Sequence, residues 1–218
     1  MEATVNGLKG LFRDAIKSEF GPMNPVMCKF ALELVDSVPG YFWTVPASSS
    51  GKHHPAFAQG EGGLARHSLM VYRWLKELVE AEPRSNVVNL DEFYPGMVVA
   101  ALFHDCCKRG MVDGDHTEFN HPILAAKFVL DKSKEFIAAN KEFIESTCDD
   151  EDSFNRDIGI AVLAIESHMG KWNKDKHSEL ELPVPSKGFQ YAVHLADYLA
   201  SRKYTMFDDE FFGRFKDK

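Results

Sequence analysis

Histidine and aspartate residues interrupt apolar segments at widely separated points of the chain, and their chemistry stands out. These residues are His67, His104, Asp105, His121, His168 and Asp197. A buried carboxylate without a partner is costly, and six such groups at the ends or inner faces of different helices call for a common explanation. Neutral imidazole nitrogens and carboxylate oxygens are good ligands for divalent ions. We therefore expect a shared site for one or two divalent metal ions (Fe, Mn, Mg, Ni or Zn).

The adjacent pair His104 and Asp105 ends the apolar run VAALFHDCCK. Neighbouring residues of a helix point about 100° apart, so the two side chains could approach one centre from two directions. The carboxylate of Asp105 has two oxygens and could bridge to a second ion.

Apolar residues at helical spacing predict helices in most of the chain. Asn24 as a cap and Pro25 at the first helical position mark one start, and Pro95 is expected to open the helix that carries His104. The predicted helical segments are 5–20, 24–38, 64–82, 95–108, 121–132, 133–147, 149–170 and 187–203. We find no alternating strand pattern of useful length, so the predicted fold is an all-α helical bundle.

Composition narrows the class of protein. The 218 residues suit one domain, and the net charge of −8 gives no global basic surface for nucleic acid. The four cysteines contain no C-x-x-C pair, and no apolar run is long enough to span a membrane. The N-terminus shows no signal-peptide pattern. We expect a cytoplasmic protein that does not enter a membrane; whether it forms a homo-oligomer stays open.

The order of these residues resembles the HD-domain metal-dependent phosphohydrolase superfamily. The matching segments are GGLARHSL, ALFHDCCK, NHPILAAKF, ESHMG and VHLADYLAS. Within it the sequence is most similar to bacterial HD exoribonuclease-type proteins, although their SHHG motif is SHMG here, with Met169 in place of the second histidine. The resemblance implies a single HD domain over residues 1–218, with core motifs in 53–203, and with N-terminal helices (1–44) and an aromatic tail (204–218) packing on it.

The resemblance also implies roles for individual residues. His67, His104, Asp105 and Asp197 match the ligands of a first metal ion. His121 and His168 match the additional histidines of two-metal members, with Asp105 as the bridge. Lys108 matches a lysine near the substrate phosphate.

Other residues near these motifs are candidates for substrate binding and proton transfer. Asp105, Lys108 and His116 are the predicted catalytic residues, with His116 placed to protonate a leaving oxygen. The predicted substrate-binding residues are His53, His54, Arg66, Lys108, Lys171 and Arg202.

Three functions are compatible with this pattern. The first is a phosphohydrolase that uses metal-activated water on a phosphorylated substrate, a nucleotide or a short nucleic acid. The second is a diiron oxygenase of HD type, since four histidines and two aspartates in this order also match its ligand set. The third is a non-catalytic binding protein stabilised by its metal.

Overall fold

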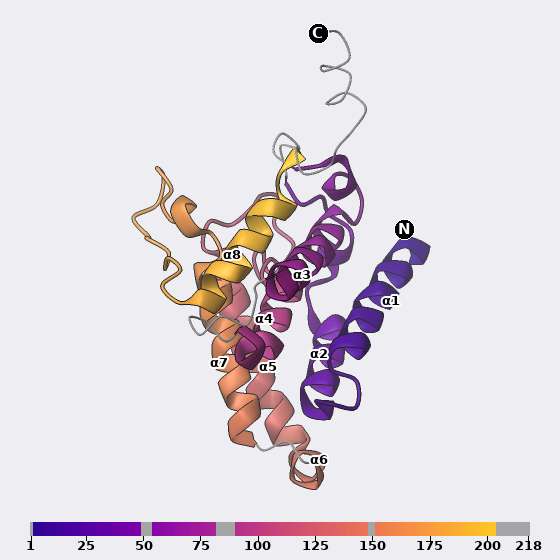
Figure 1. Ribbon diagram of the computed structural model, residues 1–218. Helices are drawn as coiled ribbons and strands as arrows, with labels where there is room; N and C mark the ends of the chain where they lie inside the picture. Colours follow the sequence, from indigo (N-terminus) through magenta and orange to yellow (C-terminus); the bar gives the residue numbers. More distant parts are fainter. Residues whose placement is uncertain (1, 49–53, 82–89, 148–150, 204–218) are drawn as a thin grey trace, which may run out of the picture.

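The computed structural model describes residues 2–48, 54–81, 90–147 and 151–203. These residues form helices and connecting loops, with one isolated antiparallel bridge between Lys174 and Glu181 and no strand, so the all-α prediction is confirmed (Figure 1). The α-helices are α1 (Glu2–Glu19), α2 (Pro25–Ser37), α3 (Gly63–Ala81), α4 (Leu90–Phe103), α5 (His121–Ala139), α6 (Lys141–Ser146), α7 (Glu151–Ser167) and α8 (Gly188–Ala200). Short 3₁₀ helices are η1 (Gly40–Trp43), η2 (Ala56–Ala58) and η3 (Gly170–Trp172).

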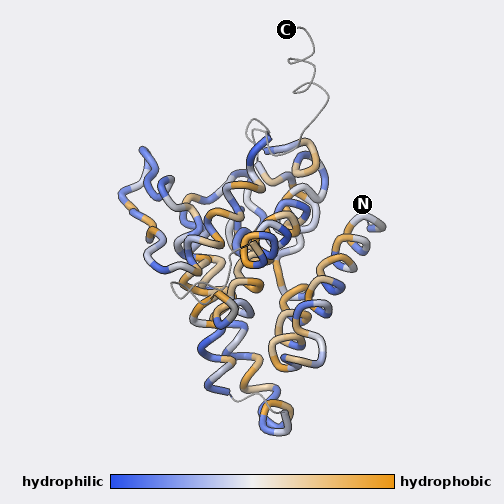
Figure 2. Tube along the Cα trace, viewed as in Figure 1, coloured by the Kyte–Doolittle hydropathy of each residue, from blue (hydrophilic) through white to orange (hydrophobic). Residues whose placement is uncertain are grey.

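Helix α4 is the centre of the bundle. It packs against α3, α7 and α8, and residues 97–103 of α4 are all fully buried. Helix α5 packs on α7, whereas α1 and α2 pack on each other and lie along one side (Figure 1). Hydrophobic residues follow the inner sides of these helices, and one continuous core extends from Leu8 in α1 to Ala200 in α8 (Figure 2). Burial of this apolar surface is the main force that assembles the bundle.

Local sequence features fix how the central helices meet. Asn24 caps α2 as predicted, accepting a hydrogen bond from Met27 N at 2.9 Å. Gly96 lets α4 approach α7 closely, because a Cβ there would lie 2.4 Å from the carbonyl oxygen of Asp157. Gln190 joins α8 to α7: its Oε1 accepts from Lys187 N, and its Nε2 donates to Ser167 Oγ and to Leu163 O.

Some predicted boundaries were wrong. Helix α4 begins at Leu90, with Pro95 inside it, and it ends at Phe103, so His104 and Asp105 lie in the turn that follows the helix. Residues 133–139 continue α5 because no Gly or Pro interrupts them, and a separate short helix, α6, follows Asn140. The predicted packing of the 204–218 tail lies outside the described residues. No described helix is long and apolar enough to cross a membrane.

Candidate metal centre

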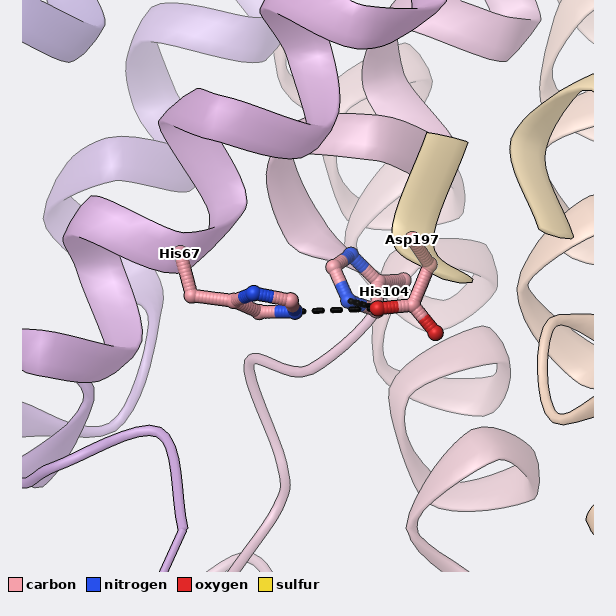
Figure 3. Close-up of side chains that lie close together, drawn as sticks. All are labelled: His67, His104 and Asp197. Carbon is pink, nitrogen blue, oxygen red and sulfur yellow. Dashed lines mark hydrogen bonds and ion pairs between the residues drawn. The ribbon is translucent and has the colours of Figure 1, made fainter. Parts of the chain in front are cut away.

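Five helix ends or neighbouring turns bring the six predicted ligands together. His67 lies in α3, His121 is the first residue of α5, and His168 directly follows α7. Asp197 lies in the last turns of α8. In Figure 3 the side chains of His67, His104 and Asp197 point toward one another from three elements. The four imidazoles and Asp105 are almost fully buried, so the cluster lies inside the bundle and not on its surface.

Asp105 joins two groups of imidazoles through its two oxygens. Its Oδ2 lies 3.5 Å from Nε2 of His104 and 3.9 Å from Nε2 of His67. Its Oδ1 lies 3.0 Å from Nε2 of His121 and 3.6 Å from Nε2 of His168. One carboxylate therefore faces two separate sets of donors, which is the arrangement expected of a bridging ligand.

Asp197 completes the first of these groups. Its Oδ1 lies 3.0 Å from Nε2 of His67 and 3.7 Å from Nε2 of His104 (Figure 3). Candidate ligand atoms of His67, His104 and Asp197 all lie within 4.8 Å of one another, and the same holds for His104, Asp105 and His168. Each of these two sets of three residues, which share His104, could hold a metal ion.

Backbone carbonyls orient three of the imidazoles. Nδ1 of His104 lies 3.0 Å from Ala101 O, Nδ1 of His121 lies 2.7 Å from Glu118 O, and Nδ1 of His168 lies 2.7 Å from Ile165 O. A carbonyl oxygen only accepts, so each Nδ1 carries a proton and each ring directs its Nε2 toward the cluster. Hydrogen bonds of this kind fix the tautomer of metal-binding histidines.

Three of the polar atoms that face the cluster have no hydrogen-bond partner in the part of the chain that the structure describes. Nε2 of His104, Nε2 of His121 and Oδ1 of Asp105 are buried without a hydrogen-bond partner among the described residues. A lone pair of His121 facing a carboxylate oxygen at 3.0 Å is repulsive unless a proton or a cation lies between them. The donor set thus fits a divalent cation, with nitrogen and oxygen ligands in a dry pocket.

Burial decides the charge states of the ring nitrogens. Desolvation and the neighbouring His104 lower the pKa of His168 to about 3, and desolvation also lowers the pKa of His104. Both rings are therefore neutral near pH 7 and available as ligands. Burial alone would raise the pKa of the Asp105 carboxyl, but Lys108 and His104 outweigh it and hold that pKa well below its usual range.

Lys108 is the cation nearest to the bridging carboxylate. Its Nζ lies 2.5 Å from Oδ2 of Asp105, and its side chain is 15% exposed. The loop that carries it is anchored by the buried Tyr41, whose hydroxyl accepts from Arg109 N at 3.0 Å and donates to Gly110 O at 2.6 Å. Lys108 is thereby held between the buried cluster and solvent.

Of the two histidines predicted in the long loop, His54 lies beside the cluster and His53 lies outside the described residues. The ring of His54 meets that of His67 edge-on, with centroids 5.1 Å apart. Its Nδ1 is buried with no hydrogen-bond partner among the described residues. Burial and the neighbouring His67 lower the pKa of His54 to about 3, so the ring is neutral and its Nδ1 can form a hydrogen bond with a substrate.

The remaining candidates are placed differently. The three guanidinium nitrogens of Arg66 donate to the carbonyls of Phe57, Glu61 and Gln59 and hold the loop before α3. The substrate contact of Arg66 stays a prediction. His116 is exposed on the 109–120 loop and makes none of the contacts that join the cluster in the described structure. Lys171 and Arg202 lie against Trp172 and Tyr198.

His194 and Tyr41 are not among the residues predicted from the sequence. His194 supports the cluster, because its Nδ1 lies 2.6 Å from the carbonyl oxygen of His168. Gly170 lies against that ring: its φ is +55°, and a Cβ there would come within 2.2 Å of His194 Cε1. The position of His194 three residues before Asp197 was the only sequence signal for its role; Tyr41 had none.

Comparisons of the chain with protein-family models, with curated proteins and with solved structures found no match.

Proposed function

We propose that this protein is a metal-dependent phosphohydrolase of the HD type that cleaves a phosphate ester of a nucleotide or a nucleic acid. The observation that carries the proposal is the placement of Asp105. Its two oxygens face different pairs of imidazoles, and Lys108 approaches it from the solvent side. Two cation positions joined by one carboxylate, with a lysine beside them, suit a substrate that carries negative charge on several oxygens.

The distances support the following division of the ligands. His67, His104, Asp197 and Oδ2 of Asp105 would hold one divalent ion, and His121, His168 and Oδ1 of Asp105 would hold the other. Ions in such a pair supply Lewis acidity toward phosphoryl oxygens and acidify a water molecule so that it can act as a nucleophile near neutral pH. The second position would have only three protein ligands, which leaves room there for water or substrate.

The protein's own side chains would position the substrate. Lys108 can exchange its contact with Asp105 for a phosphoryl oxygen, since its side chain is 15% exposed whereas that of Asp105 is 2% exposed. The neutral ring of His54 can hold a substrate oxygen beside His67. The buried walls exclude bulk water, so these charge contacts act at low local dielectric. The assignment of His116 as the acid for the leaving group stays a prediction.

The direct experiment pairs metal analysis with a substrate screen. Protein purified anaerobically is analysed for metal, and nucleotides, cyclic nucleotides and short oligonucleotides are screened with added Mn²⁺, Fe²⁺ or Ni²⁺. Asp105→Asn should lose bound metal and turnover together, because both ion positions share this carboxylate. The matched control is Asp36→Asn, which removes a carboxylate paired on the surface with Arg13 and Lys9. Turnover that survives Asp105→Asn overturns the proposal, as does turnover that needs no metal.

A diiron oxygenase is the second candidate. The observation in its favour is the nitrogen-rich donor set of four imidazoles, which suits iron. The same metal analysis and substrate screen, with O₂ consumption measured as well, distinguishes it from the phosphohydrolase. An iron-loaded protein that consumes O₂ with an organic substrate and hydrolyses no phosphate ester selects the oxygenase. Bound metal without either activity selects the non-catalytic binding protein.

A further inference from the structure

Two stacked aromatic rings with two cations over them lie at the edge of the cluster. Trp172 of η3 and Tyr198 of α8 stack with ring centroids 5.7 Å apart and planes 18° apart, and we call this pair the aromatic platform. Arg202 places its guanidinium carbon 4.1 Å from the Tyr198 centroid, and Lys171 places its Nζ 4.8 Å from the Trp172 centroid. Trp172 is 41% exposed, which is unusual for the largest apolar side chain beside a buried site.

Contacts and chain neighbours connect the platform to the cluster. The ring of His194 lies 6.2 Å from that of Trp172 and contacts the backbone of His168 through Nδ1. Tyr198 directly follows Asp197. The Asp197 side chain is 19% exposed, whereas the four imidazoles are at most 3% exposed. Solvent therefore reaches the cluster beside Asp197, and the next residue of α8, Tyr198, belongs to the platform.

We propose that the aromatic platform binds the base of a nucleotide whose phosphate lies at the cluster. Aromatic rings stack on any base through its π-face. Lys171, which lies over the Trp172 ring, would move from that face to the attached phosphates. A sugar phosphate would gain from the cations alone and would leave the exposed Trp172 ring unused. The proposal rests on the proposed function only for the position of the phosphate.

The ligand is a purine or pyrimidine base on a phosphorylated sugar. Two kinds of molecule carry this group. One is a free nucleotide, and the other is the end of a single-stranded oligonucleotide. The net charge of −8 favours the smaller ligand, since a long strand would be repelled beyond the local cations.

The test measures affinities and needs no turnover. Adenosine 5′-monophosphate, ribose 5-phosphate and a 5′-phosphorylated oligothymidylate of eight residues are titrated calorimetrically into the full-length chain. Each titration uses protein as purified and again with EDTA, which prevents hydrolysis. The variants are Trp172→Leu and Trp172→Phe, and the matched control is Tyr191→Leu, which removes a 56% exposed ring elsewhere on α8.

Wild-type protein should bind the nucleotide roughly tenfold or more tightly than ribose 5-phosphate. Trp172→Leu should weaken nucleotide binding by roughly 5- to 150-fold, the range measured for loss of one base–aromatic stack, and should leave ribose 5-phosphate unchanged. Trp172→Phe should retain most of the preference, and Tyr191→Leu all of it. Tighter binding of the oligonucleotide than of the nucleotide assigns the strand end as the source, and the reverse order assigns the free nucleotide.

Equal affinity of wild-type protein for the nucleotide and for ribose 5-phosphate overturns the proposal. So does a Trp172→Leu variant that loses affinity for both ligands alike, because that result means the stack only supports the 170–187 loop. Failure of the proposed function has a different signature: the base preference persists, but no phosphate ester is hydrolysed with any metal.

Discussion

Nε2 of His121 lies 3.0 Å from Oδ1 of Asp105 while Nδ1 of the same ring is hydrogen-bonded to the Glu118 carbonyl. The ring therefore keeps its Nδ1 on the carbonyl and directs its Nε2 at a buried carboxylate, where a proton or a cation must lie between the two atoms. His104 and His168 repeat this arrangement, each with Nδ1 on the carbonyl three residues earlier. Three buried rings are thus oriented in the same way, with Nε2 toward the cluster, and their donors could hold a metal ion.

Metal binding should stabilise the fold. An ion that binds only the folded protein adds about 2.7 kcal/mol at a free concentration of 100 Kd. For a chain of this size that corresponds to a rise in Tm of roughly 5–10 °C, measured by differential scanning calorimetry with and without metal. EDTA should reverse the rise. Asp105→Asn should abolish it and Asp36→Asn should not; an equal response of both variants would contradict the account.

Gly170 should be required for the position of His194. Because φ is +55° and an added Cβ would meet the His194 ring, Gly170→Ala should move that ring away from the His168 carbonyl. We expect a loss of stability of roughly 1–3 kcal/mol in urea unfolding, and weaker metal binding in calorimetric titration. The control is Gly159→Ala in α7, where nothing lies within 4 Å of the added Cβ. That change should stabilise the helix by roughly 0.5–1 kcal/mol.

Tyr41 should stabilise the loop that carries Lys108. Tyr41→Phe removes the hydroxyl and leaves Arg109 N and Gly110 O without this partner. The expected cost is roughly 1–3 kcal/mol, read from the midpoint of urea unfolding at constant slope. If Lys108 contacts the phosphate, the same variant should raise KM more than it lowers kcat. A variant as stable as the wild type would show that the loop is held by other contacts.

Glu19 should make stability depend on acid pH. Burial would raise its pKa, but hydrogen bonds from Lys76 Nζ at 2.8 Å, from Tyr72 and from Tyr94 OH at 3.0 Å outweigh burial and hold the pKa below its usual value. A lowered folded-state pKa contributes stability above the unfolded-state pKa, and this contribution is lost as pH falls through the folded-state pKa.

Glu19→Gln should accordingly lower the free energy of unfolding at pH 7, by roughly 1 kcal/mol. The difference from wild type should shrink as the pH is lowered below about 4, near the ordinary pKa of glutamate. Urea unfolding at pH 7, 5 and 3.5 measures the difference. Glu33→Gln serves as the control, because it removes the same charge from an exposed side chain of α2 and should change the free energy of unfolding little. A difference for Glu19→Gln that grows on acidification would be the opposite of this expectation.

Helical periodicity was sufficient to predict an all-α fold and most helix positions, since the apolar spacing and caps such as Asn24 are local properties of the chain. The end of α4 at Phe103 was not predictable in this way, because the apolar run continues through Cys106 and Cys107. The predicted helix start at Pro95 was also wrong, because the packing of α4 in the core overrides the preference of proline for the first turn of a helix.

The order of histidines and aspartates predicted which residues would lie close together, but it did not predict which of their atoms would face one another. Which oxygen of Asp105 faces which ring depends on the relative placement of five elements, and no local signal carries it. The same holds for Arg66, whose three carbonyl partners belong to a loop that composition alone cannot fold. Residues that support the cluster through backbone atoms, such as His194, leave little trace in a sequence pattern.

The most direct test of the central claim is anomalous X-ray diffraction from crystals of the protein grown with Mn²⁺ or Zn²⁺. The account predicts strong anomalous peaks on both sides of Asp105, one bonded by His67, His104 and Asp197 and the other by His121 and His168. An ordered cluster without any peak at saturating metal, or peaks bound only to surface carboxylates, would contradict it.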